Sequence, residues 1–347
     1  MKSPEPEEAP RQRLIELPTV LRQAASNADD HWGILLLAHG APDSLADIPA
    51  FLLNVRAGRP LPREAVDEII HRYQLIGGGS PLLKFTTRQA EALARVVNEV
   101  RQKQALPPIP VHFGMRNWKP FIAEAVSRLS REGVNRVLGL CLAPHNSRTS
   151  VGLYRQHLED AVQKSASGMQ VEFVPSWHDQ PELIAAFREK ILQALNRAEQ
   201  SSGQPVPVIL TAHSVPARTI ADGDPYEDEV NETAKRVAEA SGLRCWCVAF
   251  QSQGMTSEPW IGPTVESRID ELAAKGHRNV LIAPVGFVCD HVEILYDIDV
   301  VFREYGKERG IMVWRSESLN DSPLFISAVY SVVTPYIMQK AASQGGA

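Results

Sequence analysis

Two histidines in this 347-residue chain follow apolar runs in closely similar settings. Residues 35–42 read LLLAHGAP and residues 209–216 read ILTAHSVP, so His39 and His213 lie just past the ends of two strand-like segments. In open α/β sheets, ligands bind in the crevice beyond the carboxyl ends of the strands. The repeated motif therefore predicts two similar halves that face one cleft, with one imidazole from each.

A predicted helix in the second half begins with acidic residues. The segment GFVCDHVEILYD starts at Gly286 and places Glu293 in the first helical turn, with Asp297 one turn later on the same face. Taken alone, such an acid can simply compensate the helix dipole. However, the strands before His213 and Glu293 should end at one edge of one parallel sheet, so we expect these side chains to converge. An imidazole beside a carboxylate accepts protons and binds borderline divalent metals.

Two further histidines are candidates for the same cleft. By the pseudo-symmetry of the halves, His39 should approach from the opposite wall, and His145 follows a strand-like run in CLAPHNS. Three imidazoles near one cleft favour metal chemistry over acyl transfer, and the sequence has no GxSxG nucleophile motif.

Basic residues and a glycine run occupy residues 51–85. The GGGS of residues 77–80 resembles a phosphate cradle but lacks the GxxxxGK[ST] spacing, so we interpret it as a turn that needs close backbone approach. Arg56, Arg72 and Lys84 could meet ligand carboxylates, which arginine binds through two parallel hydrogen bonds. A solvated surface explains these three residues equally well.

Eight apolar runs have the character of parallel strands covered on both faces. Helical patterns alternate with them, which predicts a doubly wound α/β architecture. The strands are expected at 34–38, 109–113, 136–142, 170–174, 206–212, 244–250, 279–285 and 311–315, and the helices at 64–75, 86–103, 119–131, 151–164, 181–198, 225–240, 263–274, 291–305 and 322–342.

The duplication recurs at a second point, because GVNRVLGLCLAP (133–144) matches GHRNVLIAPVGF (276–287). The first half is 31 residues longer between the histidine and this match, and we place the insertion at about 51–85. The chain then divides into halves at 32–170 and 171–318, each a four-stranded parallel sheet flanked by helices. Residues 319–347 should form a helix that packs back across the first half, followed by a frayed end.

Composition narrows the classes of function. The net charge of −5, with no long basic run, argues against a nucleic-acid partner. The four cysteines form no CxxC pair, and we interpret them as small buried apolar residues in a reducing cytosol rather than as metal ligands or disulfides. No stretch approaches the roughly 20 apolar residues of a membrane span. Residues 1–31 predict a poorly ordered tail, with a short helix at 14–24.

Seven stretches together resemble the ferrochelatase family, most closely its soluble bacterial coproporphyrin-type members. The resemblance covers nearly all of 33–335 and implies insertion of Fe(II) into a porphyrin held in a cleft between two chelatase-like (Rossmann-like) halves. The stretches are RYQLIGGGSPL (72–82), KPFIAEAV (119–126), LAPHNSRTSVGLY (142–154), TAHSVP (211–216), GDPYEDEV (223–230), FQSQGMTSEPWIGP (250–263) and PVGFVCDHVEILYDID (284–299).

The resemblance also implies roles for single residues. His213 matches the family's catalytic histidine and Glu293 its partner glutamate, and both are iron ligands in the family. Asp297 is then a candidate second acid behind Glu293. Contacts with the porphyrin and its propionates are implied for Arg56, Arg72, Tyr73, Ser80 and Tyr154.

Two positions depart from the family pattern. His39 stands where coproporphyrin-type enzymes usually carry a tyrosine that binds product iron axially. An imidazole can also ligate haem iron, so a contact of His39 with the porphyrin and a His39-ligated product are our hypotheses. Val301 stands where the family often continues the acidic line beyond Asp297, so a carboxylate path for metal or protons is shorter here.

The resemblance implies that no cofactor is tightly bound, because Fe(II) is a substrate, and the cysteines of the iron–sulfur ferrochelatases have no counterpart. The expected partners are a porphyrin and Fe(II), with the neighbouring haem-pathway enzymes as further candidates. We expect a cytoplasmic monomer without integral membrane contact, and coproporphyrin III rather than protoporphyrin IX as substrate. The alternatives are a sirohydrochlorin-type cobalt or iron chelatase and a non-catalytic haem- or porphyrin-binding protein.

Metal insertion exchanges two pyrrole N–H protons for one Fe(II), so the site needs a proton acceptor. A neutral imidazole with an ordinary pKa of about 6.5 suits this task, and we assign it to His213. Glu293 would relay the proton or guide the metal. The opposite order, in which both residues first hold iron, stays open.

Overall fold

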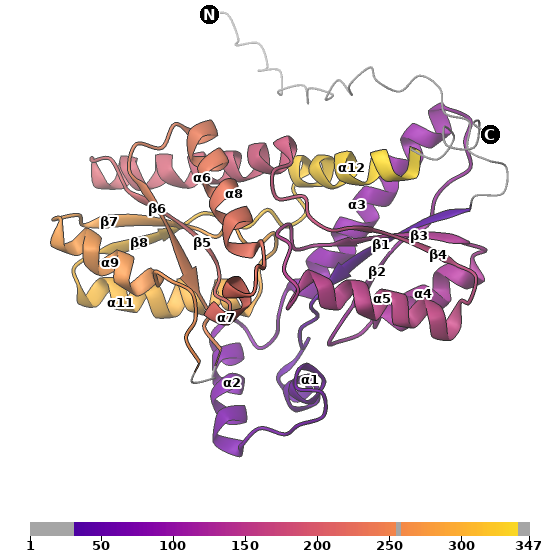
Figure 1. Cartoon of the computed structure of the whole chain (residues 1–347). Coiled ribbons are helices and arrows are strands. Elements are labelled where there is room, and N and C mark those ends of the chain that lie inside the picture. The colour runs from indigo at the N-terminus through magenta and orange to yellow at the C-terminus, as the bar shows by residue number, and fades with distance from the viewer. Residues whose placement is uncertain (1–30, 255–257, 339–347) are drawn as a thin grey trace, which may run out of the picture.

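The structure is a computed structural model that describes residues 31–254 and 258–338. Within these residues, eight strands form two four-stranded parallel sheets (Figure 1). Each predicted strand is present, and its ends differ from the prediction by no more than two residues. The strands are β1 (Trp32–Ala38), β2 (Val111–Met115), β3 (Arg136–Cys141), β4 (Gln170–Val174), β5 (Val208–His213), β6 (Trp246–Gln251), β7 (Asn279–Ala283) and β8 (Met312–Arg315).

The two sheets repeat one strand order, β2-β1-β3-β4 in the first and β6-β5-β7-β8 in the second. In the first sheet, Leu36 of β1 lies between Phe113 and Leu140. In the second, Ile209 of β5 lies between Cys247 and Ile282. Every residue of β1 is buried, because helices cover both faces of the sheet. The predicted class, two similar doubly wound halves, is confirmed.

Helices connect the strands and flank both sheets (Figure 1). They are η1 (Leu45–Asp47), α1 (Ile48–Val55), α2 (Arg63–Leu75), α3 (Leu82–Lys103), α4 (Ile122–Arg131), α5 (Val151–Ser165), α6 (Pro181–Ser202), α7 (Ala217–Ala221), α8 (Tyr226–Ser241), α9 (Val265–Ala274), α10 (Val292–Leu295), η2 (Asp297–Phe302), α11 (Arg303–Glu308) and α12 (Pro323–Met338). The helix expected at 14–24 and the last residues of the one expected at 322–342 lie outside the described residues.

Some helices differ from the expectation. The unpredicted helix α1 has the sequence IPAFLLNV, which is apolar at all but one position and so has no polar face to reveal its period. The unpredicted α7 is a helix of five residues. The single helix expected at 291–305 is broken into α10, a short helix, then η2, which is π-helical, and then α11.

A layer of three helices, α3, α12 and α6, runs across the upper side of both sheets in Figure 1. The helix α12 contacts α3 and β3 in the first half and also runs along α6. One buried cluster includes Leu36 of β1, Leu210 of β5 and Phe325 of α12, so the two halves share a core through this layer. On their other faces the sheets have separate cores, one under α4 and α5 and one under α9 and η2.

Residues 48–75 form a lobe, made of α1 and α2, at the bottom of Figure 1. The glycine-rich turn at its end needs a residue without a Cβ, because a Cβ on Gly79 would lie 2.2 Å from the carbonyl oxygen of Asp43. The next amide, that of Ser80, donates to the carbonyl of Pro42 at 3.1 Å. The turn is therefore the close approach that we predicted.

The cysteines match their predicted character only in part. Cys141 and Cys289 are buried and Cys247 is partly buried, but Cys245 is exposed because it precedes the edge strand β6. All four are free thiols. Across the described residues, no helix is long and apolar enough to cross a bilayer.

Carboxylates of the second half hold the loop that follows β3 in the first half. The side chain of Asp224 is fully buried, and it accepts hydrogen bonds from the amide of Arg148 at 2.7 Å and the hydroxyl of Ser147 at 3.2 Å. Glu229 of α8 accepts from the amide of Asn146 at 2.6 Å. These bonds join the halves beside the carboxyl ends of the strands, where the predicted site lies.

We expect Asp224→Ala to lower the free energy of unfolding by about 2–4 kcal/mol, because it leaves buried donors of the neighbouring loop without an acceptor. The matched control is Asp222→Ala, whose side chain is 58% exposed. That variant should stay within about 0.5 kcal/mol of the wild type. Urea unfolding followed by circular dichroism measures both, and equal midpoints for the two variants would contradict the assigned role of Asp224.

Candidate active site

His213 and Glu293 meet because the ends of β5 and β7 approach each other very closely. A Cβ on Gly286 would lie 2.4 Å from the Cβ of Ala212, so only glycine allows the chain after β7 to pass this close to β5. His213 is the last residue of β5, and Glu293 lies in α10. The Nε2 atom of His213 lies 3.5 Å from Oε1 of Glu293. The expected convergence of these two side chains is therefore present.

A second imidazole contacts the same carboxylate. His291, which the sequence analysis did not single out, has its Nε2 atom 3.4 Å from Oε2 of Glu293. The Nδ1 atoms of both rings face backbone carbonyls, that of Ser214 for His213 and that of Cys289 for His291. Each ring therefore donates from Nδ1 and turns Nε2 toward the carboxylate between them.

The backbone around this cluster is also held. The Tyr226 hydroxyl donates to the carbonyl of His213 at 2.9 Å, and the Gln251 amide donates to the carbonyl of Glu293 at 2.7 Å. The side chains of His213 and Glu293 remain 34% and 37% exposed. Both groups are thus anchored from behind and open to a ligand in front.

The carboxylate sets the charge of its neighbours. Burial would lower the pKa of His213, but the negative charge of Glu293 and its hydrogen bond raise this pKa to about 9. Burial opposes ionisation of Glu293, yet the two imidazoles hold the pKa of the carboxyl well below its usual range. At neutral pH the pair is therefore an imidazolium and a carboxylate. The His213 ring must therefore lose a proton before it can act as the proton acceptor that we expect from the sequence.

Asp297 lies one turn beyond Glu293, in the π-helical segment η2. Burial and, to a smaller extent, the charge of Glu293 raise the pKa of its carboxyl to about 6. A hydrogen bond from the Ser252 hydroxyl acts in the opposite direction. The guanidinium of Arg72, on α2 of the lobe, lies 5.4 Å from the ring centroid of Tyr296, the neighbour of Asp297. Its positive charge lowers the pKa of Asp297. A residue of the first half thus reaches the acidic segment of the second.

His39 stands at the end of β1 with its ring accessible to solvent. Its Nδ1 atom lies 2.9 Å from the carbonyl of Gly40, and its Nε2 atom lies 2.9 Å from the side-chain nitrogen of Asn117. Desolvation by the surrounding protein and the charge of Arg116 lower the pKa of His39 to about 4. The ring is therefore neutral, donates from Nδ1 and keeps its lone pair on Nε2.

Two buried tyrosines complete the first-half side of the site. Tyr73 lies near the end of α2, and Tyr154 lies on α5 with the guanidinium of Arg116 5.1 Å from its ring centroid. Burial raises the pKa of both phenols, and the charge of Glu293 raises them further. Glu293 acts in the same direction on His39, so residues from both halves lie within electrostatic reach of this one carboxylate.

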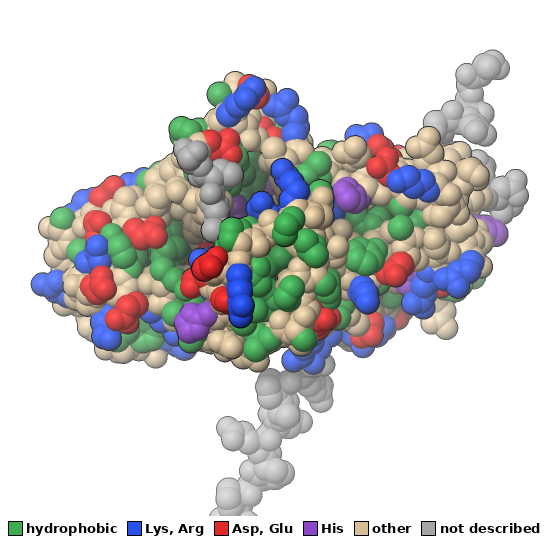
Figure 2. All heavy atoms as spheres, turned by 90° about the horizontal axis from the view of Figure 1, so that it is seen from below, with side chains coloured by type: hydrophobic (Ala, Val, Ile, Leu, Met, Phe, Trp, Pro, Cys, Tyr) green, Lys and Arg blue, Asp and Glu red, His purple; other side chains and the backbone are tan. Residues whose placement is uncertain are grey.

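The other predicted porphyrin contacts lie on or beside the lobe. Arg56 is exposed at the end of α1, where its Nε donates to the carbonyl of Arg59 at 3.2 Å. Ser80 follows the glycine turn, and its hydroxyl accepts from the amide of Leu82 at 3.3 Å. Figure 2 views the molecule from the side of the lobe and shows the surface hollowed beside this projection. Contacts or electrostatic coupling link seven predicted residues to one region, namely His213, Glu293, Asp297, His39, Tyr73, Tyr154 and Arg72. Arg56 and Ser80 make only local contacts, on or beside the lobe.

The prediction that His145 faces the cleft as a third histidine is wrong. Its ring is 2% exposed and lies 2.9 Å from the hydroxyl of Thr233, and burial followed by the charge of His178 lowers its pKa to about 3. The third imidazole of the site is His291, two residues before Glu293. A histidine two residues before a predicted catalytic glutamate could have been recognised in the sequence as a further candidate.

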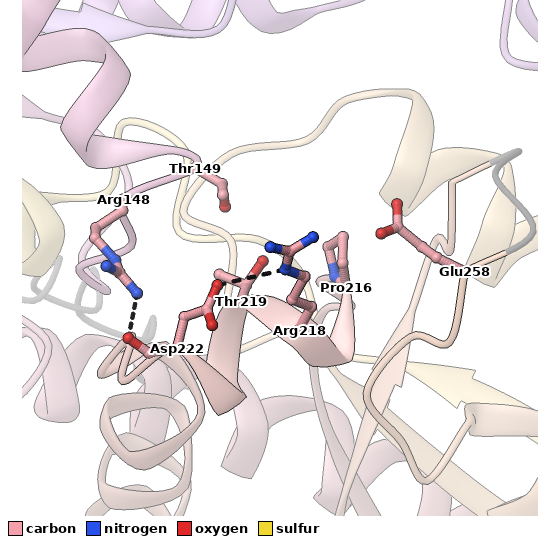
Figure 3. Close-up of a pocket in the computed structure, with 7 residues that line it drawn as sticks. All are labelled: Arg148, Thr149, Pro216, Arg218, Thr219, Asp222 and Glu258. Atoms are coloured by element: carbon pink, nitrogen blue, oxygen red, sulfur yellow. Dashed lines mark hydrogen bonds and ion pairs between the residues drawn. The ribbon is translucent and has the colours of Figure 1, made fainter.

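A separate hollow of about 210 Å³ lies beyond the loop that follows β5 (Figure 3). Its charged groups already pair, since Arg218 lies 3.7 Å from Asp222 and Arg148 donates to the carbonyl of Asp222 at 2.6 Å. No imidazole is among its lining residues, which are Arg148, Thr149, Pro216, Arg218, Thr219, Asp222 and Glu258. The chemistry of the site therefore belongs to the histidine–glutamate cluster and not to this hollow.

Solved structures similar to this one support the fold. The sirohydrochlorin chelatase SirB from Bacillus subtilis, solved with Fe³⁺, superposes with a TM-score of 0.51 at 11% identity, over 88% of this chain and 94% of that one. A cobalt complex of SirB from Bacillus subtilis subspecies spizizenii gives a TM-score of 0.50 at 9% identity, over 88% of this chain and 94% of that one. At such identities the likeness concerns the arrangement of strands and helices alone.

Sequence relatives are much closer. A ferrochelatase from Acidobacterium capsulatum is 45% identical over 87% of this chain and 93% of its own length. A coproporphyrin III ferrochelatase from Geobacillus thermodenitrificans is 35% identical over 87% of this chain and 94% of its own. The one from Bacillus subtilis is 32% identical, over 87% and 96%. The sequence model of the family described as Ferrochelatase matches residues 31–336. The chain therefore belongs to the ferrochelatase family.

Proposed function

We propose that this protein inserts Fe(II) into a porphyrin held between its two halves, with coproporphyrin III as the substrate. The observation that carries the proposal is the Glu293 carboxylate between His213 and His291, with the neutral His39 within its electrostatic reach. Membership of the family supports the activity. Relatives named coproporphyrin III ferrochelatase support the choice of porphyrin.

The resting ion pair sets the first step. His213 carries a proton at neutral pH, so it can neither bind Fe(II) nor accept a pyrrole proton until that proton leaves. Asp297, with a pKa of about 6, is the next carboxylate along the path, and Ser252 contacts it. We assign His213, once its own proton has left, as the acceptor of the two pyrrole protons one after the other. Glu293 relays each of them, and Asp297 passes each toward solvent.

The same two residues are our proposed ligands for incoming iron. Two protein ligands, His213 and Glu293, are an incomplete set for iron, so coordination positions stay open for the pyrrole nitrogens. Such transient binding suits a metal that is a substrate.

The lobe supplies groups suited to a propionate-bearing, flat and apolar ring. Arg56 is exposed at its rim and can bind a carboxylate through two hydrogen bonds, and Arg72 can do so at the acidic side of the cleft. Leu53, Val55 and Leu75 are exposed apolar side chains on the same lobe. We assign propionate contacts to Arg56, Arg72, Ser80 and the two buried tyrosines, and contact with the ring to the apolar side chains.

His39 is our proposed axial ligand of product iron. Its Nδ1–H donates to a backbone carbonyl, which is the arrangement common in metal-binding histidines, and Nε2 has a lone pair. The Asn117 side chain donates to that lone pair in the free protein, so iron would replace this hydrogen bond.

Four expectations from the sequence stay predictions. They are the absence of a tightly bound cofactor, the monomeric state, the cytoplasmic location and contact with neighbouring haem-pathway enzymes.

We expect purified protein to insert Fe(II) or Zn(II) catalytically, and faster into coproporphyrin III than into protoporphyrin IX.

His213→Ala should keep porphyrin affinity within about twofold and lower the insertion rate by at least about 100-fold, a typical loss for a proton-transfer residue. Absorption and fluorescence report both quantities. His277→Ala, at the opposite end of the sheet, is the control. Stoichiometric binding without turnover by the wild type would instead indicate a porphyrin-binding protein.

Glu293→Gln should lower the pKa of His213 from about 9 to 6.5 or below, because the charge that raises it is removed while burial, which lowers it, remains. The midpoint is read from the ring carbon signal of His213 in NMR titrations, assigned with His213→Ala. Glu266→Gln, on α9, should leave the midpoint unchanged. A midpoint near 9 in Glu293→Gln would refute the electrostatic account.

His39→Ala should change the absorption spectrum of the complex between the protein and the iron product, because an axial nitrogen ligand is lost. Asn117→Ala should leave that spectrum close to that of the wild type, because Nε2 of His39 stays available. The spectra are recorded on full-length protein with iron coproporphyrin. Identical spectra for His39→Ala and the wild type would remove His39 as ligand.

A further inference from the structure

One arginine ties together the chain on both sides of Glu293. Arg315, at the end of β8, is 15% exposed, and its Nε and Nη2 atoms lie 3.0 and 2.9 Å from the two carboxylate oxygens of Asp299. Its Nη1 atom donates to Oδ1 of Asp290 at 3.3 Å. Asp290 precedes Glu293 by three residues and Asp299 follows it by six, so a single guanidinium spans the catalytic segment from behind.

Asp290 is held from a second direction by the loop that follows β8. Its carboxylate accepts from the Ser318 hydroxyl at 2.7 Å and from the Asn320 side-chain amide at 2.9 Å, while its own amide donates to Asn320 at 2.9 Å. The carbonyl of Asn320 accepts from the Gln89 side chain of α3 at 2.7 Å. The network therefore joins the catalytic segment of the second half to a helix of the first.

The segment that carries Glu293 is one helical run with a change of geometry inside it. α10 (Val292–Leu295) is followed after Tyr296 by the π-helical η2 and then directly by α11. An isolated helix of this length is marginal in water, so tertiary contacts fix its position. Two of these contacts are the full burial of Ile294 and the hydrogen bond from the Gln251 side chain to the carbonyl of Glu293.

We propose that Arg315 is a positioning residue for metal insertion, which, by joining Asp290 to Asp299, holds the Glu293 carboxylate between His213 and His291. The proposal rests on the proposed function, because it concerns the same site. Arg315 touches neither porphyrin nor iron in this account. Its loss should therefore impair the chemical step and leave porphyrin binding intact.

The chain offers a matched control. Arg303 also pairs with Asp299, with Nη2 3.0 Å from Oδ1, but its side chain is 52% exposed and it makes no bond to Asp290 in the described residues. Arg303→Met and Arg315→Met each remove one guanidinium from the same carboxylate. Only Arg315→Met breaks the connection across Glu293.

The experiment measures steady-state Zn(II) insertion into coproporphyrin III across pH for full-length wild type, Arg315→Met, Arg315→Lys, Asp299→Asn and Arg303→Met. For Arg315→Met we expect kcat to fall about 10–100-fold, as is typical when a group that orients a ligand is lost, with KM for porphyrin within about twofold and an altered pH profile. Asp299→Asn should lower kcat in the same direction. Arg315→Lys should recover part of the rate, and Arg303→Met should stay within about twofold of the wild type.

Equal effects of Arg315→Met and Arg303→Met, or a change in KM alone, would overturn the proposal. If Arg315→Met does not fold, Asp299→Asn replaces it as the test of the proposal. An unchanged kcat in Asp299→Asn would then overturn the proposal. Histidine ring signals in NMR spectra provide a readout that needs no activity: those of His213 and His291 should shift in Arg315→Met and not in Arg303→Met. If the wild type inserts no metal, the proposed function fails, and these spectra still decide on Arg315.

Discussion

The site depends on one carboxylate that is ionised between two imidazoles. Glu293 is open to the cleft only in part, and burial alone would favour its neutral form. The charges of His213 and His291 reverse that preference. In turn, Glu293 raises the pKa of His213, and its charge is felt by His39, Tyr73 and Tyr154 in the other half. The ionised carboxylate therefore links the chemistry of both halves.

The duplicated fold produces this arrangement from ordinary packing. Parallel strands covered on both faces end together at one edge, and neighbouring strands bring distant segments of the chain side by side. Gly286 then allows the chain after β7 to pass against Ala212, and Asp224 ties the first half to the second beside the cleft. The halves share one helical layer, on the upper side in Figure 1, and this layer holds them together.

Much of this could be predicted from the sequence, because buried parallel strands are almost wholly apolar and easily recognised. The two strands before His213 and Glu293 were expected to end at one edge of one parallel sheet, so these residues were placed together correctly. Side-chain direction was not predictable in the same way. His145 also follows a strand, yet its ring turns into the interior toward Thr233, while His291 turns to the carboxylate. The raised pKa of His213 was not predictable, because it depends on the distance of 3.5 Å between its Nε2 atom and the Glu293 carboxylate, which no spacing in the sequence can give.

If the protein inserts iron as we propose, one flat ligand lies between His39 and the cluster of His213 and Glu293. A crystal structure of the wild-type protein with metal-free coproporphyrin III tests this most directly. We expect a ring with Nε2 of His39 facing one side and Nε2 of His213 facing the other, and with propionates at Arg56 or Arg72. A ring bound in the hollow of Arg148 and Arg218, or one with both imidazoles on the same side, would contradict it.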